Sequence, residues 1–213
     1  MKKALLALTA IVLLSAYNTA AQEVSVSVLY ANSSYNKFKN TTGYEIGYQQ
    51  TITSKSRLAL AFSHSFNNIY YTHNFFSTSD GKRRDREVQP KNQRLVFFID
   101  YSFNLLKSEK SKLYLGPRIG LNYLKIQEEV SERIGEESDR SSYQNDYSEK
   151  NKIGLGVLLE YERTLFLDNF SVFFAATPEI VRLSPAFSVG ANNPSAMGAV
   201  NLNLGLRFNL NKN

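Results

Sequence analysis

Six charged residues lie within segments that alternate apolar with polar side chains: Glu45, Asp100, Arg118, Glu160, Glu162 and Arg207. Carboxylates and guanidinium groups form strong, charge-assisted hydrogen bonds with one another. Glu160 and Glu162 fall on the same side of a strand, where two acids could perform acid–base chemistry. Acids placed beside arginines more often form structural salt bridges. The pattern therefore predicts an ionic network rather than a catalytic pair.

The elements that position these residues are β-strands, because apolar side chains take every second place. Alternation of this kind marks eight segments, at 23–31, 43–52, 57–71, 93–105, 112–126, 152–162, 169–177 and 199–213. Extending the parity of each segment places all six charged residues on its polar face. A slip of one residue would move Arg118 and Arg207 to the apolar face, so the register is strongly specified.

The first 21 residues read as a cleaved signal peptide. Lys2 and Lys3 precede an apolar run, and Thr19-Ala20-Ala21 supplies small residues for cleavage before Gln22. No later run approaches the ~20 apolar residues of a membrane-spanning helix. The chain has no cysteine, which excludes a disulfide framework. Removing the two lysines lowers the net charge from +6 to +4, too little to indicate nucleic-acid binding.

The connections between the segments alternate in length. Those at 53–56, 107–111 and 165–169 are short, whereas the polar ones are longer, at 32–42, 72–92, 127–151 and 184–198. Most segments run to ten residues or more, the length of a tilted membrane strand, whereas sandwich strands average about five or six. Tyrosine and phenylalanine gather toward the ends of the apolar faces, as at two membrane interfaces.

Residues 22–213 are therefore predicted to form one all-β domain: an eight-stranded antiparallel up-and-down transmembrane β-barrel with short periplasmic turns and longer extracellular loops. A soluble secreted β-sandwich is the alternative. It would also alternate, but it would partition away from membranes.

In its layout the chain resembles the small eight-stranded outer-membrane barrels of the OmpA/OmpX type, the porin-family outer-membrane β-barrel domain. The resemblance implies an outer-membrane location, contact with lipid and lipopolysaccharide, and passage by way of periplasmic chaperones and the assembly machinery. The last strand resembles the signal read by that machinery, at Asn203, Gly205, Phe208 and Leu210. Family members commonly stop on the aromatic residue, whereas Asn211-Lys212-Asn213 follows here.

An eight-stranded barrel is only wide enough inside for side chains to fill, which excludes a broad porin. Unpaired charges there would be costly, so the interior charges are expected to pair. Two interpretations stay open: an ionic network that stabilises a closed barrel, and a narrow channel or ligand-transport barrel whose pairs exchange partners.

A third interpretation is a lipid A-modifying enzyme, suggested by the sequence FSHSF at 62–66. Some outer-membrane deacylases carry a His and a Ser two residues apart on the lipid face. Here His64 has Phe62 and Phe66 on its own face, and Ser63 and Ser65 point the other way. The sequence is thus predicted to be non-enzymatic, without a cofactor or a metal site.

Two of the connections are strongly charged. Lys82, Arg83, Arg84 and Arg86 form a basic cluster, and residues 128–150 are acidic. The basic cluster could contact lipopolysaccharide phosphates, pair with the acidic segment, or remain solvated. The acidic segment lacks the spacing of a calcium loop. A structural or surface-interaction role with an unidentified external partner is the resulting hypothesis.

Overall fold

The computed structural model describes residues 21–67, 71–76, 83–106, 108, 110–134, 140–165, 169–183 and 196–210. The predicted signal peptide at 1–21 lies almost wholly outside these residues and stays a prediction. The first strand begins at Gln22, the residue predicted to start the mature chain.

The described residues form ten strands and one short 3-10 helix. They are β1 (Gln22–Ser33), η1 (Asn36–Phe38), β2 (Thr41–Thr53), β3 (Ser56–Asn67), β4 (Tyr71–Phe76), β5 (Arg83–Pro90), β6 (Asn92–Asn104), β7 (Ser111–Ile134), β8 (Arg140–Thr164), β9 (Phe170–Arg182) and β10 (Ala196–Asn209).

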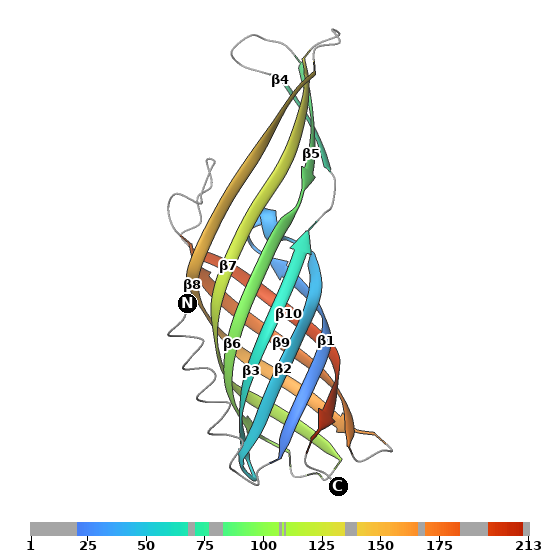
Figure 1. The fold of residues 1–213 in the computed structure, drawn as a ribbon, viewed down its shortest axis with the longest axis vertical. Coiled ribbons are helices and arrows are strands. Elements are labelled where there is room, and N and C mark those ends of the chain that lie inside the picture. Colours follow the sequence, from blue (N-terminus) through green and yellow to red (C-terminus); the bar gives the residue numbers. More distant parts are fainter. Residues whose placement is uncertain are drawn as a thin grey trace.

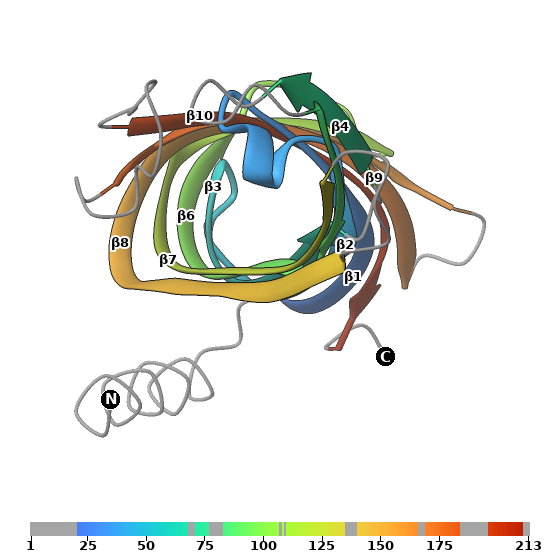
Figure 2. The ribbon, with the colours of Figure 1, turned by 90° about the horizontal axis from the view of Figure 1, so that it is seen from above.

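Eight of these strands close into a ring. They follow the order β7-β6-β3-β2-β1-β10-β9-β8, and β8 pairs again with β7. Every pairing is antiparallel, and the closing contact between β1 and β10 runs without interruption from Glu23↔Asn209 to Ser33↔Ala199. The ring is visible along its axis in Figure 2, and β1 starts at the end where β10 finishes (Figure 1). The predicted eight-stranded up-and-down barrel is confirmed.

The predicted long connections at 72–92 and 127–151 are largely strands, which corrects the expectation of polar loops. β7 and β8 continue together past the ring to Arg133↔Arg140. The hairpin of β4 and β5 adds to them, because β5 pairs with residues 128–134 of β7. These four strands form an extension beyond one rim of the barrel (Figure 1). In a hairpin the backbone N–H and C=O groups of the two strands bond to each other whatever side chains the strands carry. The sequence of the extension therefore needs no alternation of apolar residues.

The connection expected at 32–42 is also shorter than predicted. β1 continues to Ser33, β2 begins at Thr41, and η1 (Asn36–Phe38) lies in the connection between them. In the view along the axis, η1 lies inside the ring instead of projecting away from it (Figure 2). Asn40 ends this turn in the left-handed region at φ 54°, a conformation that asparagine tolerates better than most residues.

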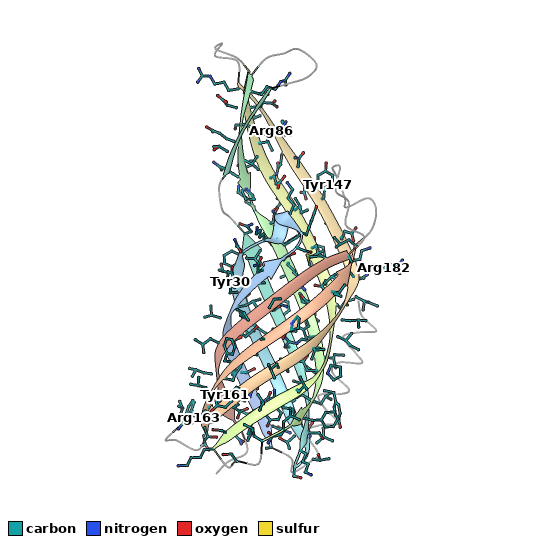
Figure 3. All side chains as sticks on the ribbon, turned by 180° about the vertical axis from the view of Figure 1, so that it is seen from behind. Tyr30, Arg86, Tyr147, Tyr161, Arg163 and Arg182 are labelled. Atoms are coloured by element: carbon teal, nitrogen blue, oxygen red, sulfur yellow. The ribbon has the colours of Figure 1, made fainter. Side chains whose placement is uncertain are left out.

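The outer wall of the ring is apolar and exposed. Val28 is 71% exposed, Ile180 64% and Leu204 61%, while their strand neighbours Ser27, Glu179 and Asn203 are buried. Tyr161 lies toward the short-turn end of the wall and Tyr30 toward the other end (Figure 3). A continuous apolar surface of this extent fits a hydrocarbon environment, where a closed barrel leaves no unpaired strand edge. No helix in the described part of the chain is long and apolar enough to cross a membrane.

Candidate functional site: the charged interior of the barrel

The largest group of interior charges lies near the short-turn end, and we call it the turn-end cluster: Glu23, Arg57, Lys112, Glu160, Glu162 and Arg207. Arg207 on β10 donates from Nη1 and Nη2 to the two carboxylate oxygens of Glu160 on β8, at 2.8 and 3.1 Å, and also from Nη1 to Glu162. Arg57 on β3 lies 2.8 Å from Glu160 (Nη2 to Oε1). β3 and β8 stand three strands apart around the ring, so this ion pair crosses the lumen.

Aromatic rings support both arginines of this cluster. The Arg57 guanidinium lies 3.6 Å above the centre of the Tyr114 ring, and that of Arg207 lies 4.6 Å above Phe173. Arg57 Nε also donates to Ser102 Oγ at 3.0 Å. A guanidinium that stacks on a ring while its edge binds carboxylates is held in one orientation. The turn-end cluster is therefore rigid as well as ionic.

A middle cluster is centred on Arg118 of β7. Its Nε and Nη2 donate to Asp100 of β6 at 2.7 and 3.0 Å, and Nη2 also donates to Glu45 Oε1 at 2.9 Å. Asp100 faces Arg118 directly in the β6–β7 register, whereas Glu45 comes from β2, three strands away. Phe98 lies under the guanidinium at 4.1 Å. One arginine thus joins two walls of the barrel.

A smaller outer cluster lies nearer the extended rim. Arg94 Nε donates to Asn122 Oδ1 at 2.8 Å, and Arg94 Nη2 pairs with Glu179. Asn201 Nδ2 donates to the same Glu179 at 3.0 Å. All four side chains are buried. The three clusters together connect opposite walls at successive levels of the lumen.

Above the outer cluster the interior turns apolar, in what we call the mouth cluster: Phe38, Leu124, Ile126, Val181, Leu183 and Met197, with Tyr35 packed against them. Phe38 is 2% exposed although it belongs to η1 in a connection. Ser34 N donates to Gly198 O at 2.8 Å, and Asn92 Nδ2 donates to Lys37 O at 2.8 Å. Burial raises the pKa of the Tyr35 phenol, against the opposing effect of Lys37. The connection between β1 and β2 therefore closes this end of the lumen.

The structure brings the six predicted interior residues together in two groups. Glu160, Glu162 and Arg207 meet in the turn-end cluster, and Glu45, Asp100 and Arg118 in the middle cluster. Sequence reasoning missed Glu23, Arg57 and Glu179. The parity of the first and third segments already placed Glu23 and Arg57 on the polar face, so that signal was available. Glu179 lies beyond the predicted end of its segment at residue 177.

The basic cluster lies on the extension. Arg84 Nη1 donates to Glu132 Oε1 at 3.1 Å, and Arg86 Nη2 lies 3.6 Å from Glu132 Oε2, so both pair with the acidic segment. Arg86 is seen far from the ring in Figure 3. The backbone of Arg83 begins β5, and Lys82 lies outside the described residues. Of the interpretations left open for this cluster, pairing with the acidic segment is the one that the geometry favours for Arg84 and Arg86.

Three residues of the predicted assembly signal lie on β10, on both of its faces, and Leu210 directly follows the strand. Asn203 points inward and donates to Ser27 Oγ at 3.0 Å. Phe208 and Leu210 are exposed on the outer wall, where the Phe208 ring lies 5.0 Å from that of Phe170. A Cβ on Gly205 would come within 2.4 Å of Val26 O, so the close approach of β1 requires glycine there.

His64 lies on the outer face, between the rings of Tyr44 at 5.6 Å and Phe66 at 5.8 Å. Its strand neighbours Ser63 and Ser65 are buried on the inner face. The pairing of β2 and β3 sets Tyr44 directly opposite His64. This geometry separates the imidazole from both hydroxyls. In the described part of the chain no cluster of His, Asp and Glu could hold a metal ion.

No protein-family model and no curated protein matches the sequence. Among solved structures, the chain is similar to Neisserial surface protein A (NspA), with 15% identity and a TM-score of 0.56 over 88% of this chain and 96% of that one. The chain has the fold of a small outer-membrane β-barrel. Two lower-scoring similarities are to Ail of Yersinia pestis (13%, TM-score 0.42, 89% and 99%) and to the N-terminal barrel of Pseudomonas aeruginosa OprF (14%, 0.42, 89% and 99%).

The NspA similarity concerns the fold, and it agrees with the predicted resemblance to OmpA/OmpX-type barrels. An apolar outer wall around a polar, ion-paired interior is the arrangement that a bilayer imposes on a closed barrel. The protein accordingly has the architecture of an outer-membrane β-barrel, with its short turns at one rim and its β4–β5 and β7–β8 extension at the other.

Proposed function

We propose that this protein is a non-enzymatic, closed outer-membrane barrel with a structural or surface-interaction role. The observation that carries the proposal is the order in which layers of side chains fill the lumen. The turn-end, middle and outer clusters join opposite walls through buried ion pairs, and the mouth cluster adds an apolar layer above them. Ions would have to displace charged partners at three levels and then cross apolar side chains.

The extension supplies the surface that such a scaffold would present. Its strands are joined by ion pairs and hydrogen bonds, among them Lys91–Glu129 at 2.6 Å and Gln127–Asp146 at 3.2 Å. Tyr143 and Tyr147 on β8 are 42% and 41% exposed there. Exposed tyrosines offer large, rigid contact areas to a partner. A stiff extracellular platform on a closed barrel therefore supports a role in surface contact or envelope maintenance.

Conductance measurements in planar bilayers test the closed-lumen proposal. The purified protein should insert without producing discrete current steps, because the three ion-pair clusters and the mouth cluster together block the lumen. A steady conductance that changes in Arg118→Ala or Arg207→Ala would instead establish the narrow channel. That second candidate is favoured by one observation, the polar character of the lumen below the mouth cluster.

The enzymatic alternative has its own test. Deletion of the gene should leave the mass of lipid A unchanged, since His64 is separated from both neighbouring serines. If deletion changes the mass of lipid A, and His64→Ala produces the same change, the protein is a lipid-modifying enzyme and the proposed structural role is wrong.

We further propose the route by which the protein arrives. Residues 1–21 would be removed on export, and periplasmic chaperones and the assembly machinery would receive the chain through Asn203, Gly205, Phe208 and Leu210. Support comes from the start of β1 at Gln22 and from the outward exposure of Phe208 and Leu210. Mass spectrometry of the mature protein should find Gln22 at its N-terminus. Outer-leaflet lipid and lipopolysaccharide would then surround the apolar wall.

A further inference from the structure

A polar pocket of about 280 Å³ opens at the periplasmic end of the lumen, below the turn-end cluster. Its walls come from the ends of β1, β7, β8, β9 and β10 and include Lys110, Lys112 and Arg207. The volume is near the lower limit of small-molecule sites, which span about 300–1,000 Å³. The site is therefore of the size that accepts a small solute.

The pocket carries an excess of positive charge. Three cations, Lys110, Lys112 and Arg207, face two carboxylates, Glu23 and Glu162, which leaves a net charge of +1. Both carboxylates already have donors, because Glu23 accepts from Gln49 and Glu162 accepts from Arg207. Arg207 is also paired with Glu160 behind the wall, and the turn-end cluster as a whole is neutral, so the uncompensated charge at the pocket is that of Lys110.

One of these cations has donor capacity to spare and is open to the pocket. Lys112 Nζ lies 3.7 Å from Glu162 Oε1, an ion-pair distance too long for a hydrogen bond, and its side chain is 32% exposed. The ammonium group carries three donors, so an oxygen of a ligand can accept from it.

Neutral hydrogen-bonding groups complete the lining, among them the hydroxyls of Thr164 and Ser171. Cationic donors beside hydroxyls suit an oxyanion, because each oxygen of a carboxylate or a phosphate accepts more than one hydrogen bond. We propose that this pocket binds a small periplasmic solute through its carboxylate or phosphate group, with Lys110 and Lys112 as donors. This site is separate from the extracellular surface that the proposed function uses.

The experiment is a ¹H–¹⁵N chemical-shift titration of the folded protein in detergent micelles, with chloride holding the ionic strength constant. Inorganic phosphate and acetate are the two probes, in separate arms. At least one should produce saturable shifts at the backbone amides of Ser171 and Asn209, and the arm that does so identifies the oxyanion class. Lys110→Gln and Lys112→Gln should each weaken that binding about tenfold, the loss expected for one charge-assisted hydrogen bond.

Lys55→Gln is the matched control, because it removes the same charge from another periplasmic turn without touching the pocket. It should leave the binding unchanged. Lys110 is exposed, so its variant tests the site even if Lys112→Gln reduces folding. The proposal is overturned if neither probe saturates, or if Lys55→Gln weakens binding as much as Lys110→Gln does. Neither result would affect the closed-lumen proposal, whose test is conductance.

Discussion

Arg118 on β7 donates to both carboxylate oxygens of Asp100 on the neighbouring β6, at 2.7 and 3.0 Å. The two residues are direct partners in the β6–β7 register. A fork of two parallel hydrogen bonds fixes orientation as well as distance. The Arg118–Asp100 pair therefore fixes the register of β6 against β7. Shifting either strand by one residue would turn one of these charges toward lipid.

Removing the guanidinium of Arg118 should strongly destabilise the barrel. Arg118→Ala leaves Asp100 and Glu45 buried without their cation, and loss of one partner from a buried pair costs about 3–5 kcal/mol. The free energy of unfolding, measured by urea titration of the protein folded in micelles or vesicles, should fall by that amount.

Lys91→Ala is the matched control for this prediction, since it breaks an ion pair whose two side chains are both about half exposed. Its cost should be about 1 kcal/mol or less. Equal losses in the two variants would show that burial of the middle cluster contributes nothing to stability.

Gly205→Ala should impair closure of the ring between β1 and β10. The added methyl group would lie 2.4 Å from Val26 O, a backbone atom that cannot move without breaking the ladder. Gly198 lies on the same strand, but there a methyl group would meet only Ser34 Oγ at 3.6 Å, an ordinary contact. Heat-modifiable gel mobility should show less folded protein for Gly205→Ala and wild-type amounts for Gly198→Ala. The reverse order would contradict the observed spacing of β1 and β10.

Phe38→Ala should loosen the mouth cluster without opening a pore. Truncating a buried phenylalanine costs about 3–5 kcal/mol, and here the loss falls on the connection that η1 occupies. Amide hydrogen exchange at residues 34–40 should accelerate, whereas the exposed Lys39→Ala should change stability by about 0.5 kcal/mol or less. Conductance should stay absent, because the three ionic clusters remain. A current through Phe38→Ala would mean that the mouth cluster alone seals the lumen.

An arginine placed on the outer wall should cost more in the middle of the wall than at its edge. Leu204 lies midway along β10, and Ile52 lies at the turn end of β2; both side chains are more than half exposed. Leu204→Arg should reduce the free energy of unfolding in bilayers by about 2–4 kcal/mol, and Ile52→Arg by about 1 kcal/mol or less. Equal costs would argue against a depth-dependent lipid contact.

The ring of eight strands could be predicted because each strand of a barrel in lipid must alternate apolar residues facing out with polar residues facing in. Each wall strand of this chain shows that alternation. The extension could not, because its strands have no continuous apolar face: Glu128 and Glu132 are buried on β7 beside Val130, and Ser141 and Ser142 on β8 are exposed. Pairing there depends on the hairpin backbone, which leaves no period-two signal of apolar residues.

The candidate site was predictable in part for the same reason. The alternation of faces identified Arg118 and Arg207. It also places Arg57, the first residue of its segment, on the polar face, although Arg57 was not predicted as part of the network. Glu179 was missed because it follows Pro178, and proline argues against a continuing central strand. In the structure the β8–β9 ladder is interrupted at Pro178 and resumes at Gly156↔Glu179. The position of η1 inside the ring depends on burial of the Phe38 side chain. A single buried residue in a connection has no periodic pattern by which it could be predicted.

The most direct test of the account uses the absence of cysteine from the chain. Single cysteines at Leu204 and Asn203 would carry a fluorophore in protein folded into vesicles whose lipids bear quenchers at the bilayer centre. The barrel predicts strong quenching at Leu204, which is 61% exposed on the outer wall, and little at Asn203, which is 1% exposed inside. Quenching at Asn203 together with protection at Leu204 would contradict the whole arrangement of wall and lumen.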